Sequence, residues 1–162
     1  QPSQYAKLAA GKQYAVYSAP SDTSFRAANG KALLSTNDWV QVFFEEDGYL
    51  LVQYAISRHQ YRIGYIKADA VSNLSEVAEI GSWANYPAQV LRTSALTDDP
   101  LNSCGAVMTL TAGQQVTYLG QLGQEWAFVE TTTAQGQRIR GFVELSELNV
   151  TRPDDADDNL NG

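Results

Sequence analysis

Two stretches of the chain share one order of apolar and polar positions. Residues 48–71 read as an apolar strand led by an aromatic residue, a polar turn, and a second strand in which Gly64 precedes an aromatic and a β-branched residue. Residues 125–148 repeat this order, led by Trp126 and with Gly141 at the position of the strand glycine. The pattern predicts that the chain is a duplication of one small, strand-rich unit.

The first copy is predicted to begin with a short strand and to continue as a three-strand meander. Strands are expected at 13–17, 39–44, 49–54 and 62–66, because each segment is rich in β-branched and aromatic residues and ends at a polar or glycine-containing turn. The apolar run Leu50-Leu51-Val52 indicates burial on both faces of its strand.

The segments between and around these strands are predicted from their polar residues and turn motifs. Residues 1–11 have weak apolar content and are expected to form an extended or frayed lead-in. A long polar loop, 21–31, carries the turn signal Asn29-Gly30, because both residues tolerate positive φ. Residues 67–71 are expected to form one tight helical turn.

The second copy follows the same plan. Residues 88–91 are matched to 14–17, and 97–102 form the long turn. Residues 107–110 lead to a turn at 111–113, and a strand at 115–119 precedes the repeated motif.

The duplication divides the chain into four parts. The predicted parts are a first unit at 12–71, a linker at 72–85, a second unit at 86–150 and an acidic flexible tail at 151–162. The linker is expected to contain one or two helical turns at 75–80, which end at Gly81. Trp83 and Tyr86 are expected to pack between the two units.

Several short motifs carry a family resemblance. In the first copy they are Val16-Tyr17-Ser18-Ala19-Pro20, Trp39-Val40-Gln41-Val42, Gly48-Tyr49-Leu50-Leu51-Val52 and Arg62-Ile63-Gly64-Tyr65-Ile66-Lys67. In the second copy they are Val90-Leu91-Arg92, Gly113-Gln114-Gln115-Val116-Thr117, Glu125-Trp126-Ala127-Phe128-Val129 and Gly141-Phe142-Val143. Over residues 12–71 and 86–150 the chain thus resembles the bacterial SH3-like domain, which is used in tandem in secreted and cell-envelope proteins.

The resemblance implies an all-β fold of two tandem, small, five-stranded SH3-like barrels joined by a short, partly helical linker. It also implies binding of peptidoglycan, a peptide or a protein, and its motifs contain no catalytic residues. The longer loop at 26–32 resembles that of gut Firmicutes proteins that carry the domain. The second copy departs from the pattern, because no proline follows its first strand directly.

Composition and charge give no indication of nucleic-acid binding or membrane insertion. The hydrophobic fraction of 44% and aromatic fraction of 10% are those of an ordinary globular protein. Residues 1–81 hold seven Lys or Arg against eight Asp or Glu, a net charge of -1, whereas residues 82–162 hold four against ten, a net charge of -6. No basic stripe for nucleic acid and no apolar run of about 20 residues for membrane insertion is present.

Catalytic and metal sites are not indicated. The chain has one histidine, His59, and one cysteine, Cys104, and neither has the flanking residues of a cysteine-peptidase motif. The carboxylate groups at 45–47 and 98–99 are interpreted as solvated turns, without the apolar pocket that general-acid catalysis requires. The acidic residues at 154–158 lack the glycine and distal glutamate of an EF-hand loop. We therefore expect no enzyme activity, no metal and no cofactor.

Aromatic residues are more informative. The first copy has more tyrosine and tryptophan than a 60-residue core needs, and tyrosine is well suited to binding surfaces. A ligand groove is expected beside the long first loop, lined by Tyr17, Phe25, Arg26, Asn29, Trp39 and Tyr54. The alternative is that the aromatic residues form the core.

The leading hypothesis is therefore a non-catalytic, extracytoplasmic binding module for a cell-wall fragment, a peptide or a protein, with any signal or anchor outside the given chain. The alternative is a structural spacer without a ligand groove of its own, for which the contact between the two units is expected to be large and apolar. The sequence leaves the oligomeric state open.

Overall fold

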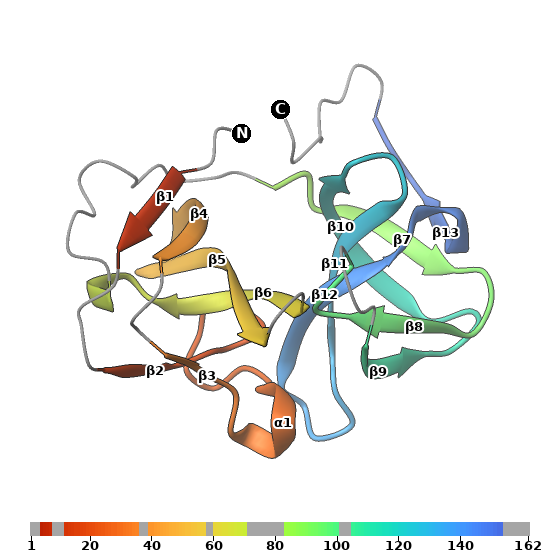
Figure 1. Cartoon of the computed structure of the whole chain (residues 1–162). Coiled ribbons are helices and arrows are strands. Elements are labelled where there is room, and N and C mark those ends of the chain that lie inside the picture. The colour runs from red at the N-terminus through yellow and green to blue at the C-terminus, as the bar shows by residue number, and fades with distance from the viewer. Residues whose placement is uncertain are drawn as a thin grey trace.

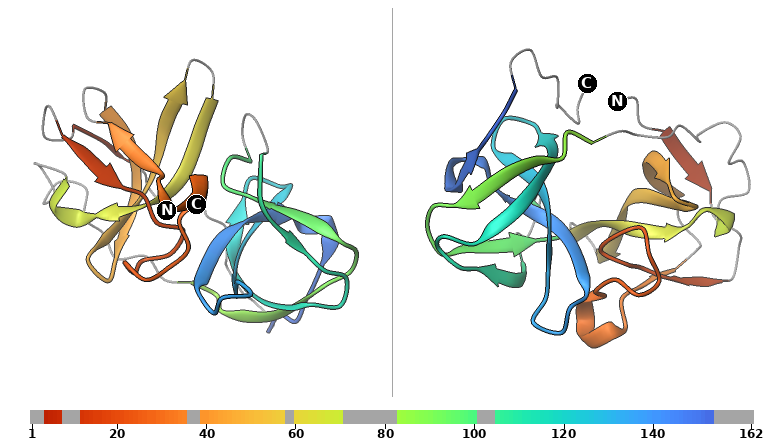
Figure 2. Two further views of the ribbon diagram at one scale, coloured as in Figure 1. Left: turned by 90° about the horizontal axis from the view of Figure 1, so that it is seen from below. Right: turned by 180° about the vertical axis from the view of Figure 1, so that it is seen from behind.

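The computed structural model describes residues 4–7, 12–35, 39–57, 60–70, 83–100 and 105–153, and only the backbone of residues 4–7, Trp39, Phe44 and Ser57. The strands form two neighbouring bodies, drawn red to yellow and green to blue in Figure 1, and Figure 2 shows the same division from two further directions. We call residues 4–70 the first half and residues 83–153 the second half.

The first half contains six strands and two short helical segments. They are β1 (Gln4–Lys7), β2 (Gln13–Ala15), α1 (Ala27–Gly30), β3 (Leu33–Ser35), β4 (Trp39–Glu46), β5 (Tyr49–Ser57), β6 (Gln60–Lys67) and η1 (Ala68–Ala70). The second half contains β7 (Tyr86–Val90), β8 (Ser94–Thr97), β9 (Ala106–Leu110), β10 (Gln115–Leu122), β11 (Trp126–Thr132), β12 (Arg138–Glu144), η2 (Leu145–Glu147) and β13 (Leu148–Val150).

All the described strand pairs are antiparallel, and the expected all-β class is confirmed. In the first half, β1-β4-β5-β6 form one sheet and β2-β3 a second. In the second half, the strand order is β13-β7-β10-β11-β12-β8-β9. Among the described residues, no strand pairing closes a sheet into a barrel.

Some strands lie where the sequence pattern predicted none, among them β1, β3, β8 and β13. Residues 4–7, within the lead-in that was expected to be extended or frayed, are extended and pair with β4 as β1. Residues 94–97 form β8, which pairs with β9 and, through Thr97 opposite Phe142, with β12. The match of 88–91 to 14–17 is wrong, since β7 pairs with β10 in the way that β1 pairs with β4.

Gly64 and Gly141, the glycines of the repeated motif, lie where another segment of the chain crosses the last strand of each meander. A Cβ atom added to Gly64 would lie 2.6 Å from Val16 Cγ1 and 3.2 Å from the Tyr17 oxygen. A Cβ atom added to Gly141 would lie 2.8 Å from Leu96 Cγ and 3.0 Å from the Thr97 oxygen. Each position therefore needs glycine because another backbone passes against it.

The expected turns are confirmed where the structure describes them. Asn29 and Gly30 have φ of 56° and 80°, and Ala28 also has positive φ, so α1 is an irregular turn. Residues 68–70 form the short helical turn η1. The predicted helical turns at 75–80 and the tail beyond residue 153 lie outside the described residues.

Each half buries an apolar cluster of its own. The first cluster includes Leu50, Val52 and Tyr54 of β5, whereas Ile139 and Val143 of β12 belong to the cluster of the second half. Alternate residues of these strands point to the opposite face, because side chains in a strand alternate with period two.

The opposite faces of the two sheets meet and form a third apolar cluster, which we call the seam cluster. Its buried members are Leu51, Ile63 and Tyr65 of the first half and Leu119, Leu122, Phe128 and Phe142 of the second half. The run Leu50-Leu51-Val52 is therefore buried on both faces, as predicted, with exposed fractions of 0%, 2% and 0%. The contact between the halves is part of the core of the molecule.

Candidate functional site

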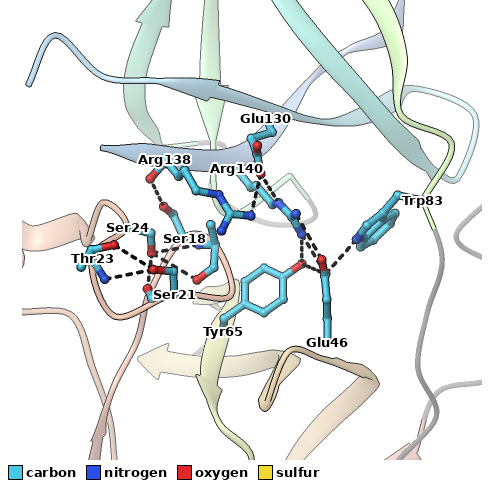
Figure 3. A network of polar contacts seen from close by, with 11 residues as sticks. Ser18, Ser21, Thr23, Ser24, Glu46, Tyr65, Trp83, Glu130, Arg138 and Arg140 are labelled. Carbon is cyan, nitrogen blue, oxygen red and sulfur yellow. Dashed lines mark hydrogen bonds and ion pairs between the residues drawn. The ribbon is translucent and has the colours of Figure 1, made fainter. Parts of the chain in front are cut away.

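A charged network crosses the seam beside the apolar cluster. Arg140 of β12 lies in it with only 6% of its surface exposed. Its Nη1 donates to Glu46 Oε1 at 2.9 Å and to the Tyr65 hydroxyl at 2.8 Å, both in the first half. Its Nε donates to Glu130 Oε1 at 2.7 Å in its own half. Figure 3 shows the guanidinium group between the two carboxylates.

Neighbouring side chains complete the network. Trp83 Nε1 donates to Glu46 Oε1 at 2.8 Å, and the Trp83 ring lies 5.3 Å from the ring of Phe128. Arg138 Nη2 donates to Glu130 Oε1 at 3.1 Å. The prediction that Trp83 packs between the units is therefore confirmed. Tyr86 instead stacks on Tyr118 of the second half, with ring centroids 6.0 Å apart.

The protonation states follow from these contacts. Burial raises the pKa of Glu130. The hydrogen bonds and charges of Arg140 and Arg138 lower this pKa by more than burial raises it, so the net shift is downward. Burial lowers the pKa of Arg140, whereas Tyr65 and the carboxylates of Glu46 and Glu130 raise it above its ordinary range. Burial also raises the pKa of Tyr65, so its hydroxyl stays protonated and donates to Glu46.

The apolar cluster and the charged network contribute differently. Each fully buried apolar or aromatic side chain contributes about 1.5–3 kcal/mol, and the seam cluster holds seven such residues. A buried ion pair contributes little net stability, because desolvation of both charges offsets their attraction. Apolar burial therefore accounts for most of the stability of the contact between the halves, and the network satisfies the polar groups that the contact buries.

Three of the six predicted ligand residues lie around the start of the long loop. Tyr17 is half-buried, packs against the seam cluster and has the Arg26 guanidinium 5.4 Å from its ring centroid. Phe25 packs against the core of the second half, and its N–H donates to the Arg138 oxygen at 2.8 Å. The Arg26 Nη2 donates to the Ala32 oxygen at 2.6 Å. The loop is thereby closed on itself and on the second half.

The other three predicted residues are dispersed. Tyr54 is 3% exposed in the first core, and burial together with the charge of Asp98 raises its pKa to about 12. Asn29 is exposed in α1. Trp39 begins β4, and its side chain lies outside the described residues.

The space that these residues share is small. Tyr17, Phe25 and Tyr54 line one cavity of about 20 Å³, together with Asp98 and Arg140 from the second half. A cavity of this size holds about one water molecule. In this conformation the second half covers the place where the groove was expected, and a ligand role for the six residues stays a prediction.

The interpretation of the carboxylates as solvated turns is wrong for three of them. Glu46 pairs with Arg140 across the seam, and Asp99 is 2% exposed. Asp98 lies 3.7 Å from the Arg62 guanidinium, and burial raises its pKa despite that pair. The sequence could not show the pairs of Glu46 and Asp98, because their partners belong to the other half.

A larger, open hollow lies at another part of the seam, and we call it the seam groove. It has a volume of about 470 Å³ and is lined by Gln41, Phe43, Gln53, Pro100 and residues 122–126. Gln124 and Glu125 also line an adjoining hollow of about 490 Å³, which extends to Glu144 and residues 145–146. Sequence reasoning missed this site, although the half-buried Trp126 beside Gln124 and Glu125 was a signal.

Other chemistry has little support within the described part of the chain. There, no group of three or more His, Cys, Asp or Glu residues is placed to hold a metal ion. Likewise, no described helix is long and apolar enough to cross a membrane. His59 and Cys104 lie outside the described residues.

Comparisons with known proteins give distant likenesses. No family model and no curated protein matches the chain. Among solved structures, the chain is similar to NlpC2 from Trichomonas vaginalis, at 13% identity and a TM-score of 0.36, over 97% of this chain and 51% of that one. It is also similar to NlpC1 from Trichomonas vaginalis, at 15% identity and a TM-score of 0.34, over 93% and 47%. The chain thus spans about half the length of these two structures, and the likeness is too weak to bear on function.

Proposed function

We propose that this protein is a non-catalytic binding module of two tandem SH3-like units, which bind a cell-wall fragment, a peptide or a protein at the bacterial cell surface. The observation that carries the proposal is the seam groove. Its volume of about 470 Å³ is within the range of small-ligand sites, and it combines aromatic rings with a few polar side chains.

The strand pairings support the duplication within this proposal. In each half a meander of three strands, β4-β5-β6 or β10-β11-β12, ends in a short helical turn. In each half the last meander strand is crossed by a segment that bonds opposite the residue after its glycine, Tyr17 opposite Tyr65 and Thr97 opposite Phe142. The closed five-stranded barrel of the resemblance remains part of the proposal.

Co-sedimentation with purified peptidoglycan sacculi tests the cell-wall part of this function. We expect the intact protein to sediment with the sacculi in a saturable manner and to remain in solution without them. A soluble digest of the same sacculi should release it. If the protein stays in solution at every sacculus concentration, and a peptide library leaves its tryptophan fluorescence unchanged, the binding function is contradicted.

The seam favours one alternative, a rigid spacer. A buried apolar cluster and a buried Arg140 network between the halves are what two units need in order to hold a fixed distance and angle. A spacer requires the seam and does not require the groove. Substitution of groove residues would then leave every measured interaction of the protein unchanged, whereas disruption of the seam would not.

A further inference from the structure

The seam groove lies on the faces of interior strands. Gln41 and Phe43 belong to β4, which lies between β1 and β5, and Gln53 belongs to β5, which lies between β4 and β6. Trp126 belongs to β11, between β10 and β12. Gln41, Gln53 and Trp126 are each paired with a strand on both sides, and Phe43 lies at a bulge between β4 and β5. A peptide that binds by adding a strand to a sheet edge therefore finds no edge here, and recognition depends on side chains.

The side chains of the groove combine two chemistries. Phe43 and Trp126 are both half-buried against the seam cluster, so their rings are held in place and partly accessible. Gln53 and Gln124 supply carboxamides, each with two N–H donors and one acceptor oxygen. Within the described part of the chain, neither carboxamide makes a hydrogen bond to protein. Flat aromatic rings pack against the C–H faces of a ligand, and carboxamides form hydrogen bonds with its hydroxyl or acetamido groups. The groove therefore suits a ligand that carries both.

The charge of the groove disfavours anionic ligands. Among the described residues, neither hollow is lined by Lys or Arg, and both contain carboxylates, Glu125 in each and Glu144 in the second. Phosphate-bearing polymers and acidic peptides are therefore repelled. Carboxylates and aromatic rings also attract cations, so a cationic peptide is the competing ligand that the experiment below includes.

The turn between β10 and β11 is held in place. Gln121 Nε2 donates to the Gly123 oxygen at 2.8 Å, and the Leu145 N–H donates to the Glu125 oxygen at 2.7 Å. Gln124 and Glu125 thus stand on a fixed turn between the two hollows, and a chain-like ligand can continue from one hollow into the other. A preorganised site of this kind loses little conformational entropy on binding.

From these observations we infer that the seam groove binds a neutral glycan chain, with a sugar ring against Trp126 and hydrogen bonds from Gln53 and Gln124 to hydroxyl or acetamido groups. The inference rests on the proposed binding function and names its ligand class. It places the glycan on a surface built by both halves, away from the long first loop.

The probe is a neutral tetrasaccharide of β-1,4-linked N-acetylglucosamine, titrated into the intact protein and followed by tryptophan fluorescence and calorimetry. We expect saturable binding. Gln53→Ala and Gln124→Ala should each weaken it about three- to tenfold, as expected for loss of one net hydrogen bond. Trp126→Phe should also weaken it and should reduce the fluorescence change.

Two matched controls separate the groove from other surfaces. Gln115→Ala removes an exposed carboxamide elsewhere on β10, and Asn29→Gly changes the exposed residue of the first loop while tolerating its positive φ. Both should bind as tightly as the unchanged protein. Thermal unfolding of each variant checks that the fold is retained.

The outcomes distinguish this inference from the general binding function. No saturable binding of the tetrasaccharide, or binding that Gln53→Ala and Gln124→Ala leave unchanged, would overturn the glycan site. So would loss of binding in Asn29→Gly alone, or tight groove-dependent binding of a tetralysine peptide in place of the sugar. If sacculi still bind the double variant Gln53→Ala/Gln124→Ala, the binding function stands without this site.

Discussion

At the scale of single residues, Arg140 has the largest consequences, because it is buried and contacts charged groups of both halves. Arg140→Met keeps much of the side-chain length but leaves Glu46 and Glu130 without their common partner. We expect a loss of about 3–5 kcal/mol in the free energy of unfolding, as when one partner of a buried ion pair is removed. Denaturant titration measures it.

The control is Arg92, which pairs with Glu147 and has 67% of its side chain exposed. Arg92→Met should change stability little, because solvent and salt screen such a pair. Equal losses in both variants would contradict the importance of the seam network.

The pH dependence of stability belongs to the same scale. The folded-state pKa of Glu130 lies below its ordinary value of 4.5, so its contribution to stability is fully present above pH 4.5 and is lost as the pH falls through the folded-state pKa. Glu130→Gln should therefore be less stable than the unchanged protein at neutral pH, and this difference should shrink below pH 4.5. Unfolding free energies at a series of pH values measure the difference.

The pKa of Asp98 is shifted upward, opposite to that of Glu130, so Asp98 provides a comparison for the pH dependence. Its pKa is raised by burial, so the folded state binds the proton more tightly than the unfolded state and this group adds stability as the pH falls. Asp98→Asn should remove that gain. A pH-independent difference for Glu130→Gln would show that its carboxylate is not engaged as the structure indicates.

At the scale of elements, Gly64 of β6 and Gly141 of β12 determine how closely a crossing segment approaches each meander. Gly64→Ala and Gly141→Ala each place a methyl group within 3.0 Å of another side chain. We expect each to cost about 1–3 kcal/mol, because neighbouring atoms must shift to relieve the overlap. Thermal and denaturant unfolding measure the loss.

Ser146→Ala is a suitable comparison for these variants, since Ser146 is an exposed residue of η2. Its stability should be close to that of the unchanged protein. If Gly64→Ala and Gly141→Ala were equally well tolerated, the close approach of the crossing segments would be wrong.

At the scale of the whole molecule, the seam cluster predicts that the two halves unfold together. Leu51 points away from the core of its own half and belongs to the seam cluster, so Leu51→Asp places a charge in the seam alone. We expect one calorimetric transition for the unchanged protein and two for Leu51→Asp, because an unpaired buried charge is strongly unfavourable. Two transitions in the unchanged protein would contradict the coupling.

Much of the fold could be predicted from the sequence, because strand and turn preferences depend on neighbouring residues. The meander strands, the Asn29-Gly30 turn, the short turn at 68–70 and the burial of both faces of β5 follow from local patterns. These patterns are alternation, apolar runs, β-branching and the conformational freedom of glycine. Strands β1, β3, β8 and β13 were missed, because each has only three or four residues, too few for a clear alternation of apolar and polar positions.

The candidate site was less predictable than the fold. The aromatic excess pointed to the first loop, but Phe25 packs on the second half and Tyr54 lies in the first core. Trp126, Gln53 and Gln124 come from strands and a turn that meet only when the two halves pack together. A single-sequence pattern contains no information about that packing.

The sequence by itself determined the all-β class, the positions of most strands and the glycines that each meander needs, because these depend on local alternation and backbone freedom. Tertiary structure alone decided which face of each sheet meets the other half. That choice pairs Glu46 with Arg140, reduces the expected groove to about 20 Å³ and leaves an open hollow beside Trp126. The reason is that the seam is made by long-range apolar burial between two sheets, which no local pattern specifies.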